Sequence, residues 1–256
     1  MPKNEPPKPA IPFVGRAKEL GRLRQWHRQR KLVLILGAPG VGKTTLVAQA
    51  GRSLSLLVCP QSERLSDICA SLEAQLGLAP ANAHLISRKN RLLPALAERG
   101  QAVVFDAVGW TTPMLSSFFE CVAGRVPVWI VSRSEHPWDT GHVWPLLSRF
   151  ERLELHPFHP AETRELVERG VAAGQFPAAV LDTVEQLHQL AVGNPQVLCE
   201  LLEGLASGRY DPHKRFDLKL LALDRRIGHL TATPFTGCGA ASARSAKPAR
   251  PAPRRA

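Results

Sequence analysis

The sequence contains no apolar run of the length that crosses a membrane. Its longest apolar stretches, such as Leu32–Leu36 and Ala102–Phe105, are far shorter than the roughly 20 residues that a membrane helix needs. The amino terminus, MPKNEPPKPA, has prolines and lysines but no apolar segment, which is not the pattern of a secretory signal. The five cysteines form no CxxC pair, so neither a disulfide framework nor a structural zinc site is expected. These absences predict a protein of the reducing cytoplasm without a membrane partner.

Acidic residues are the scarcer charged group. The chain has 22 Asp and Glu against 33 Lys and Arg, a formal net charge of +11. More than half of this excess lies after residue 223, so the rest of the chain is only mildly basic. A basic body can attract nucleic acid, but a solvated basic surface explains this density of charge equally well.

Strand-length apolar runs alternate with longer helical patterns in the first part of the chain. The runs consist of consecutive Val, Leu and Ile, as in strands covered on both faces, and they lie at 31–37, 54–58, 102–106, 126–132 and 152–155. This alternation predicts an α/β fold with a five-stranded parallel sheet flanked by helices. Wholly helical patterns follow at 160–173, 177–191 and 195–207, each beginning at or beside a proline, which suits the first turn of a helix.

We therefore expect four segments. These are a disordered arm over 1–10, an α/β domain over 11–157, a small all-helical lid domain over 158–223 and a basic low-complexity tail over 224–256. The arm is rich in proline and the tail in Ala, Arg, Pro and Ser. Neither has an apolar period that could offset its ordering entropy.

A phosphate-binding motif follows the first predicted strand directly. Gly37–Thr44, GAPGVGKT, matches the Walker A pattern GxxxxGK[ST] without a gap. Glycines let the backbone turn its N–H groups toward phosphate oxygens, and the next helix adds the positive end of its dipole. The lysine supplies charge for the β- and γ-phosphates, and the hydroxyl after it is a ligand for Mg²⁺. The motif predicts a P-loop NTPase; the alternative is a glycine-rich turn that binds nothing. The residues expected at the nucleotide are Gly37, Pro39, Gly40, Val41, Gly42, Lys43, Thr44 and Thr45.

A second acidic element is expected at the end of a strand neighbouring the P-loop strand. Asp106 closes the run at 102–106, and with Thr44 it is predicted to hold Mg²⁺; the alternative is a cap on the following turn. The next residue is Ala107. Alanine has no group that accepts a proton from an attacking water, so either the base comes from elsewhere or hydrolysis is slow.

Five short segments together resemble AAA+-related P-loop ATPases, most closely the signal-transduction (STAND) and Orc/Cdc6-like group. They are FVGR (Phe13–Arg16), GAPGVGKTT (Gly37–Thr45), VVFDAVGW (Val103–Trp110), WIVSR (Trp129–Arg133) and GNP (Gly193–Pro195). The resemblance covers about residues 12 to 223. Ala107 departs from it, because many of these ATPases carry an acid at that position.

The resemblance implies roles for further residues. Val14, Gly15 and Arg16 would lie beside the adenine, and Pro195 of the lid would touch the base or ribose. Arg133, at the sensor-1 end of a strand, would face the γ-phosphate and act in catalysis together with Lys43 and Asp106. The alternatives are a solvated loop arginine for Arg133, an ion pair within its own helix for Arg16 and a plain helix cap for the GNP turn. Arg149 and Arg152 are candidates for an arginine acting across subunits, and the sequence does not choose between them.

The function expected from these features is that of an ATP-binding switch with Mg²⁺, a weak ATPase at most, acting through a protein effector or in a homo-oligomer. The missing acid at Ala107 suits a slow switch. The main alternative is an oligomeric DNA-associated AAA+ ATPase of the transposition or replication type, which the basic balance and the tail favour. A small-molecule kinase is a third alternative. No guanine-reading NKxD segment is present, which favours ATP over GTP.

Overall fold

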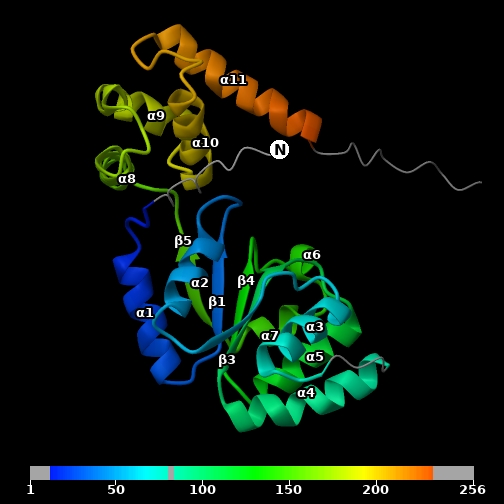
Figure 1. The fold of residues 1–256 in the computed structure, drawn as a ribbon. Helices are drawn as coiled ribbons and strands as arrows, with labels where there is room; N and C mark the ends of the chain where they lie inside the picture. Colours follow the sequence, from blue (N-terminus) through cyan, green and yellow to red (C-terminus); the bar gives the residue numbers. More distant parts are fainter. Residues whose placement is uncertain (1–11, 80–83, 233–256) are drawn as a thin grey trace, which may run out of the picture.

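A parallel sheet of five strands forms the centre of the larger part of the protein, seen in a computed structural model that describes residues 12–79 and 84–232 (Figure 1). The strand order is β2-β3-β4-β1-β5. All neighbouring strands run parallel, so the predicted fold class is confirmed, and each of the five predicted runs overlaps a strand. The strands are β1 (Val33–Gly37), β2 (Leu56–Cys59), β3 (Ala102–Val108), β4 (Val128–Ser132) and β5 (Glu151–Leu155).

Helices cover both faces of the sheet. Alternate residues of one strand point to opposite faces, so Val33 and Ile35 pack with α1 and α2, whereas Leu34 packs with α3, α4 and α5 on the other side. Strands β1, β3 and β4 are buried along most of both faces, so their sequences are mostly apolar, whereas the edge strand β5 exposes Arg152 and Glu154. The helices of this part are α1 (Ala17–Arg28), α2 (Lys43–Gly51), α3 (Leu65–Leu76), α4 (Leu85–Arg99), α5 (Pro113–Ala123), α6 (Pro137–Thr140) and α7 (Trp144–Leu147).

The strand order corrects one expectation. Asp106 lies on β3, and β4 separates β3 from the P-loop strand β1, so the acid is not on a neighbouring strand. Parallel strands nevertheless end at the same edge of a sheet, which is where open α/β sheets bind ligands. The P-loop after β1, Asp106 of β3 and Arg133 after β4 therefore share that edge.

The helices after β5 form a separate bundle, called the lid below. It has a hydrophobic core of its own, which includes Leu166, Leu187, Leu198 and Leu201. Figure 1 shows the lid beyond the P-loop edge of the sheet. Its elements are α8 (Pro160–Ala172), the 3-10 helix η1 (Ala178–Thr183), α9 (Val184–Ala191), α10 (Pro195–Ala206) and α11 (Arg215–Ala232).

Helix α11 extends further than the sequence pattern indicated. Residues 224–232, expected in the low-complexity tail, belong to this helix. The expected arm over 1–10 and the tail beyond residue 232 lie outside the described residues. In the part of the chain that the structure describes, no helix is both long enough and apolar enough to cross a membrane.

Candidate nucleotide site between the P-loop and the lid

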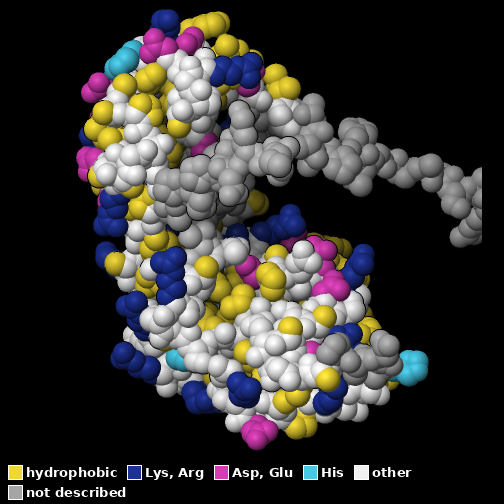
Figure 2. All heavy atoms as spheres, viewed as in Figure 1, with side chains coloured by type: hydrophobic (Ala, Val, Ile, Leu, Met, Phe, Trp, Pro, Cys, Tyr) yellow, Lys and Arg dark blue, Asp and Glu magenta, His cyan; other side chains and the backbone are white. Residues whose placement is uncertain are grey.

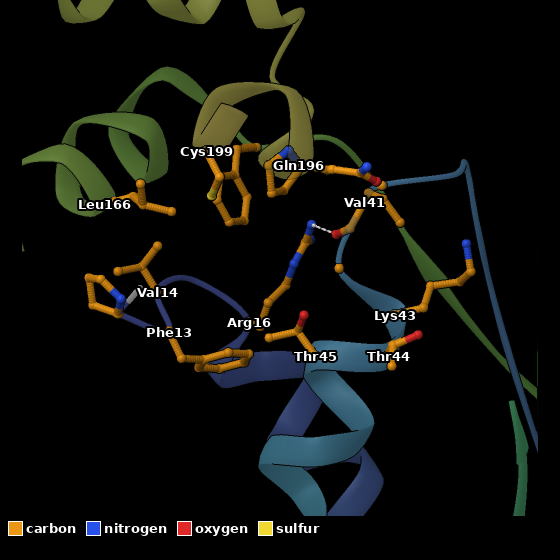
Figure 3. Close-up of a pocket in the computed structure, with 15 residues that line it drawn as sticks. Phe13, Val14, Arg16, Val41, Lys43, Thr44, Thr45, Leu166, Gln196 and Cys199 are labelled. Carbon is orange, nitrogen blue, oxygen red and sulfur yellow. Dashed lines mark hydrogen bonds between the residues drawn. The ribbon is translucent and has the colours of Figure 1, made fainter. Parts of the chain in front are cut away.

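A cavity of about 380 Å³ lies between the P-loop and the lid (Figure 3). Three parts of the chain form its walls: the segment before α1, the loop between β1 and α2, and the lid. This is room for a ligand of the small-molecule class. The lining residues are Pro12, Phe13, Val14, Arg16, Gly40, Val41, Gly42, Lys43, Thr44, Thr45, Phe158, Leu166, Pro195, Gln196 and Cys199.

The P-loop takes backbone angles that favour glycine. Gly40 and Gly42 have φ of 78° and 95°, a region that L-residues with a side chain rarely adopt. Gly37 cannot carry a side chain for a steric reason, since a Cβ there would lie 2.7 Å from the carbonyl oxygen of Leu155. The loop ends where α2 begins at Lys43, so the first N–H groups of α2 and the positive end of its dipole meet the cavity.

Lys43 holds its ammonium over the loop. Its Nζ donates to the carbonyl oxygens of Gly37 at 2.7 Å and Ala38 at 2.9 Å. Burial lowers the pKa of Lys43, the charge of Asp106 raises it, and the charge of Arg133 lowers it. Asp106 lies in β3, and Lys43 and Arg133 follow β1 and β4; these strands end at the same edge of the sheet, and the charges of Asp106 and Arg133 act on Lys43.

Asp106 is 4% exposed, and its Oδ1 accepts a hydrogen bond from the N–H of Ala107 at 2.7 Å. The pairing of β3 with β4 shifts register between Phe105 and Val108, and Ala107 in this irregularity has φ of 54°. The side chain of Ala107 is exposed, whereas its neighbours in β3 are buried. The bulge thus keeps the carboxylate of Asp106 buried and leaves the side chain of residue 107 exposed at the carboxyl end of β3.

Arg16 ties three segments together. Its Nη2 donates to the carbonyl oxygens of Val41 at 3.3 Å and His156 at 2.5 Å. Its Nη1 pairs with Glu19 at 3.3 Å, and its guanidinium lies 5.1 Å from the centre of the Phe158 ring. The side chain is therefore buried among the P-loop, the connection after β5 and the lid. Arg16 also lines the cavity, and Figure 3 shows its guanidinium directed at Val41. Arg16 therefore makes the ion pair with its own helix and also lines the cavity.

The lid contacts the P-loop directly. The side-chain amide of Asn194 donates to the carbonyl oxygen of Pro39 at 2.9 Å, and the backbone N–H of Gln196 donates to that of Gly40 at 3.1 Å. A Cβ on Gly40 would lie 2.7 Å from Asn194 Oδ1 and 2.9 Å from Gln196 Oε1. The glycine therefore allows the start of α10 to approach the loop this closely.

The residues expected at the nucleotide meet the cavity in part. Val14, Arg16, Pro195 and the run Gly40–Thr45 line it, whereas Gly15, Gly37 and Pro39 do not. Asp106 and Arg133 lie outside its lining, and Arg152, a candidate to act across subunits, pairs with Glu135 at 2.6 Å. Sequence reasoning missed the lining residues Pro12, Phe13, Phe158, Leu166, Gln196 and Cys199. Only two of these had a local signal, because Phe13 begins the FVGR segment and Gln196 follows the GNP turn.

The fold is that of a P-loop NTPase, and solved ATPase structures share it. The chain superposes on a signal transduction ATPase with numerous domains (STAND) and a tetratricopeptide repeat sensor from Pyrococcus horikoshii, with a TM-score of 0.51 and 17% identity over 84% of this chain and 33% of that one. It superposes on the Aeropyrum pernix Orc1 protein, solved in complex with DNA, with a TM-score of 0.62 and 17% identity over 86% and 69%. A Walker-type ATPase from Pyrococcus abyssi gives a TM-score of 0.62 and 15% identity over 89% and 76%.

The likeness lies in the fold alone, because identities of this size leave the site residues free to differ. The sequence matches no protein-family model and no curated protein. This chain spans only about a third of the Pyrococcus horikoshii protein. The resemblance found in the sequence and the likeness in structure agree on one group of folds.

Proposed function

We propose that this protein binds Mg-ATP in the cavity between the P-loop and the lid and acts as a slow, nucleotide-dependent switch. The observation that carries the proposal is the pair of hydrogen bonds from Asn194 and Gln196 to the carbonyls of Pro39 and Gly40. A ligand whose phosphates lie on the P-loop meets the same loop that the lid holds. Its binding therefore favours one arrangement of lid and sheet, and a few kcal/mol of such preference shifts a two-state population.

The chain's own groups fit the nucleotide. The N–H groups at the start of α2 and the Lys43 ammonium meet phosphate charge, and Phe13, Val14 and Leu166 supply an apolar wall for a base. The Thr44 hydroxyl and the Asp106 carboxylate are the oxygen donors that Mg²⁺ takes. Arg133 adds positive charge at the same edge of the sheet, where its field acts on Lys43.

The slow rate follows from residue 107. A general base typically contributes about 100-fold or more to a rate, and alanine offers none. Residue 107 is exposed at the carboxyl end of β3 while Asp106 is buried beside it, so a glutamate at 107 could supply the base without replacing the metal ligand.

The test measures ATP binding and turnover on wild type and four variants. Lys43→Ala should abolish binding, while Lys31→Ala should leave it unchanged, because Lys31 precedes β1 at the opposite edge of the sheet and pairs with Glu151. Ala107→Glu should raise turnover by about 10-fold or more, and Ala107→Gln, which has no basic group, should not. Equal binding by wild type and Lys43→Ala would contradict the proposal, as would brisk turnover by wild type.

A DNA-associated ATPase is the second candidate, favoured by the surface charge. Lys and Arg side chains gather along α1 at the edge of the sheet part (Figure 2). Those that are exposed there are Lys18, Arg22, Arg24, Arg28 and, just beyond the helix, Arg30. A basic stripe of this kind attracts phosphate backbones in a salt-dependent manner. Turnover that rises with added duplex DNA at low salt, and falls back at high salt, would favour this function.

A further inference from the structure

Helix α11 packs on the other lid helices by one face. Leu218 and Leu221 are 1% and 5% exposed and belong to the lid core. Leu221 lies against Gly204 of α10, where a Cβ would be only 2.5 Å from its Cδ1. Arg225 on the same face pairs with Glu200 of α10. Side chains three or four residues apart lie on one face of a helix, so these contacts fix how α11 is turned on the lid.

The face turned away from the lid carries a second apolar stripe, which we call the α11 seam: Phe216, Leu220, Leu223 and Ile227. These side chains are 74%, 38%, 51% and 49% exposed. Their spacing of four, three and four residues is that of the d and a positions of a heptad repeat. The second half of α11 extends beyond the other lid helices (Figure 1). A continuous apolar stripe on an exposed helix marks an interaction surface.

The charges beside the seam identify its partner. Asp217 and Asp224 flank it on one side, at e positions, and Lys219 and Arg226 flank it on the other, at g positions. In a parallel pair of such helices, each g residue faces the e residue five places further along the other helix. Lys219 would then meet Asp224 of the partner subunit. In an antiparallel pair like charges would face each other, aspartate to aspartate and lysine to arginine, which is destabilising.

We propose that α11 pairs in parallel with α11 of a second copy of this chain, through the α11 seam, to give a two-fold symmetric dimer joined at the lids. Asp224 accepts from the hydroxyl of Tyr210 through Oδ2 at 2.6 Å, so its carboxylate is held in place by a residue of the same lid. The helix is already folded on the lid, so pairing does not have to nucleate it. The dimer does not require nucleotide, so its test is independent of the proposed function.

Sedimentation of the full chain over a concentration series, without nucleotide, tests the dimer. Wild type should pass from 28.0 kDa to twice that mass as concentration rises. The double substitution Leu220→Asp/Leu223→Asp should raise the dimer dissociation constant by about 100-fold or more. Both positions are exposed, so the fold should survive, and circular dichroism checks this. Ile86→Asp, the same change at a 71% exposed side chain of α4, should leave the dimer intact.

A cysteine substitution tests the orientation. In a parallel pair the two copies of position 223 lie at the same level, so Leu223→Cys should form a disulfide-linked dimer on oxidation that wild type, with its own five cysteines, does not form. A wild type that stays at 28.0 kDa throughout the series would overturn the proposal. A dimer that survives the double substitution, or one in which Leu223→Cys gives no cross-link, would overturn it equally.

Discussion

At the scale of single residues, the most informative position is Ala107, which has φ of 54°. A side chain in this left-handed region costs about 1–2 kcal/mol. Part of that is returned by the smaller entropy of the unfolded alanine chain. Ala107→Gly should therefore raise the free energy of unfolding by about 0.5–1 kcal/mol, measured by urea denaturation.

The control for this prediction is Ala95→Gly, inside α4, where glycine should lower the free energy of unfolding by about 1 kcal/mol. Equal losses at both positions would show that Ala107 is unstrained in solution. The same backbone argument applies to Ala107→Glu: glutamate inherits the strain already present, so its effect on turnover is not confounded by a new loss of stability.

At the scale of elements, the connection between β5 and the lid depends on a glycine. Gly193 has φ of 66°, and a Cβ there would lie 2.4 Å from the carbonyl oxygen of Phe158. The N–H of Phe158 also donates to the carbonyl oxygen of Gly193 at 2.7 Å. Gly193→Ala should therefore lower the free energy of unfolding by about 3 kcal/mol, from backbone strain together with overpacking.

Gly174 is the matched control, because it has φ of 71° and no heavy atom would lie within 4 Å of a Cβ added there. Gly174→Ala should lower the free energy of unfolding only by the backbone strain, about 1 kcal/mol. Thermal unfolding of the two variants separates the two contributions. Equal losses would mean that the connection relaxes around the new methyl group and that the close approach of Gly193 to Phe158 is not required.

Most of the elements could be predicted from the sequence because their signals are local. The three inner strands are mostly apolar since both of their faces are buried, and the P-loop is a contiguous motif between a strand and a helix. The strand order could not be predicted, because nothing in the run at 126–132 indicates that it lies between the strand of the P-loop and the strand that carries Asp106. The end of α11 was missed because residues 224–232 contain only two large apolar residues, Ile227 and Leu230, although the helix continues through them.

The site was predicted only where its residues are close in sequence. The contact of Asn194 with Pro39 joins residues 155 positions apart, and no local pattern signals it. The left-handed conformation of Ala107 had no signal either, since alanine is an ordinary strand or helix residue and the bulge depends on pairing with β4. The alanine at position 107, where many of the ATPases that the sequence resembles carry an acid, could be read from the sequence. The exposure of its side chain is known only from the fold.

At the scale of the whole molecule, two hydrophobic parts meet across the candidate site. The sheet and the lid have separate cores, and Val14, from the segment before α1, packs with the lid core. Arg16 and Asn194 then supply polar links from each side to the P-loop. Because the two units have separate cores, we expect a small free energy to govern their relative position, as the proposed switch requires.

Asn194 allows this link to be weakened without unfolding the lid. Its Oδ1 accepts from the N–H groups of Gln196 and Val197 and so caps α10, while its Nδ2 donates to Pro39. Serine is a good N-cap but lacks the amide donor. Asn194→Ser should change the free energy of unfolding by about 0.5 kcal/mol or less, yet speed amide hydrogen exchange at Gln196, whose N–H is bonded to Gly40. Mg-ATP should slow that exchange again if the nucleotide holds lid and loop together.

The control is Thr112→Ser at the N-cap of α5, whose side chain accepts from Leu115, and exchange at Gln196 should not respond to it. Unchanged exchange at Gln196 in Asn194→Ser would show that the lid is held on the loop by other contacts, with Arg16 as the first to examine. A third outcome is that Mg-ATP slows exchange at Gln196 in wild type but not in Asn194→Ser. That result would place Asn194 itself in the coupling, because the nucleotide could then hold the lid only through that amide.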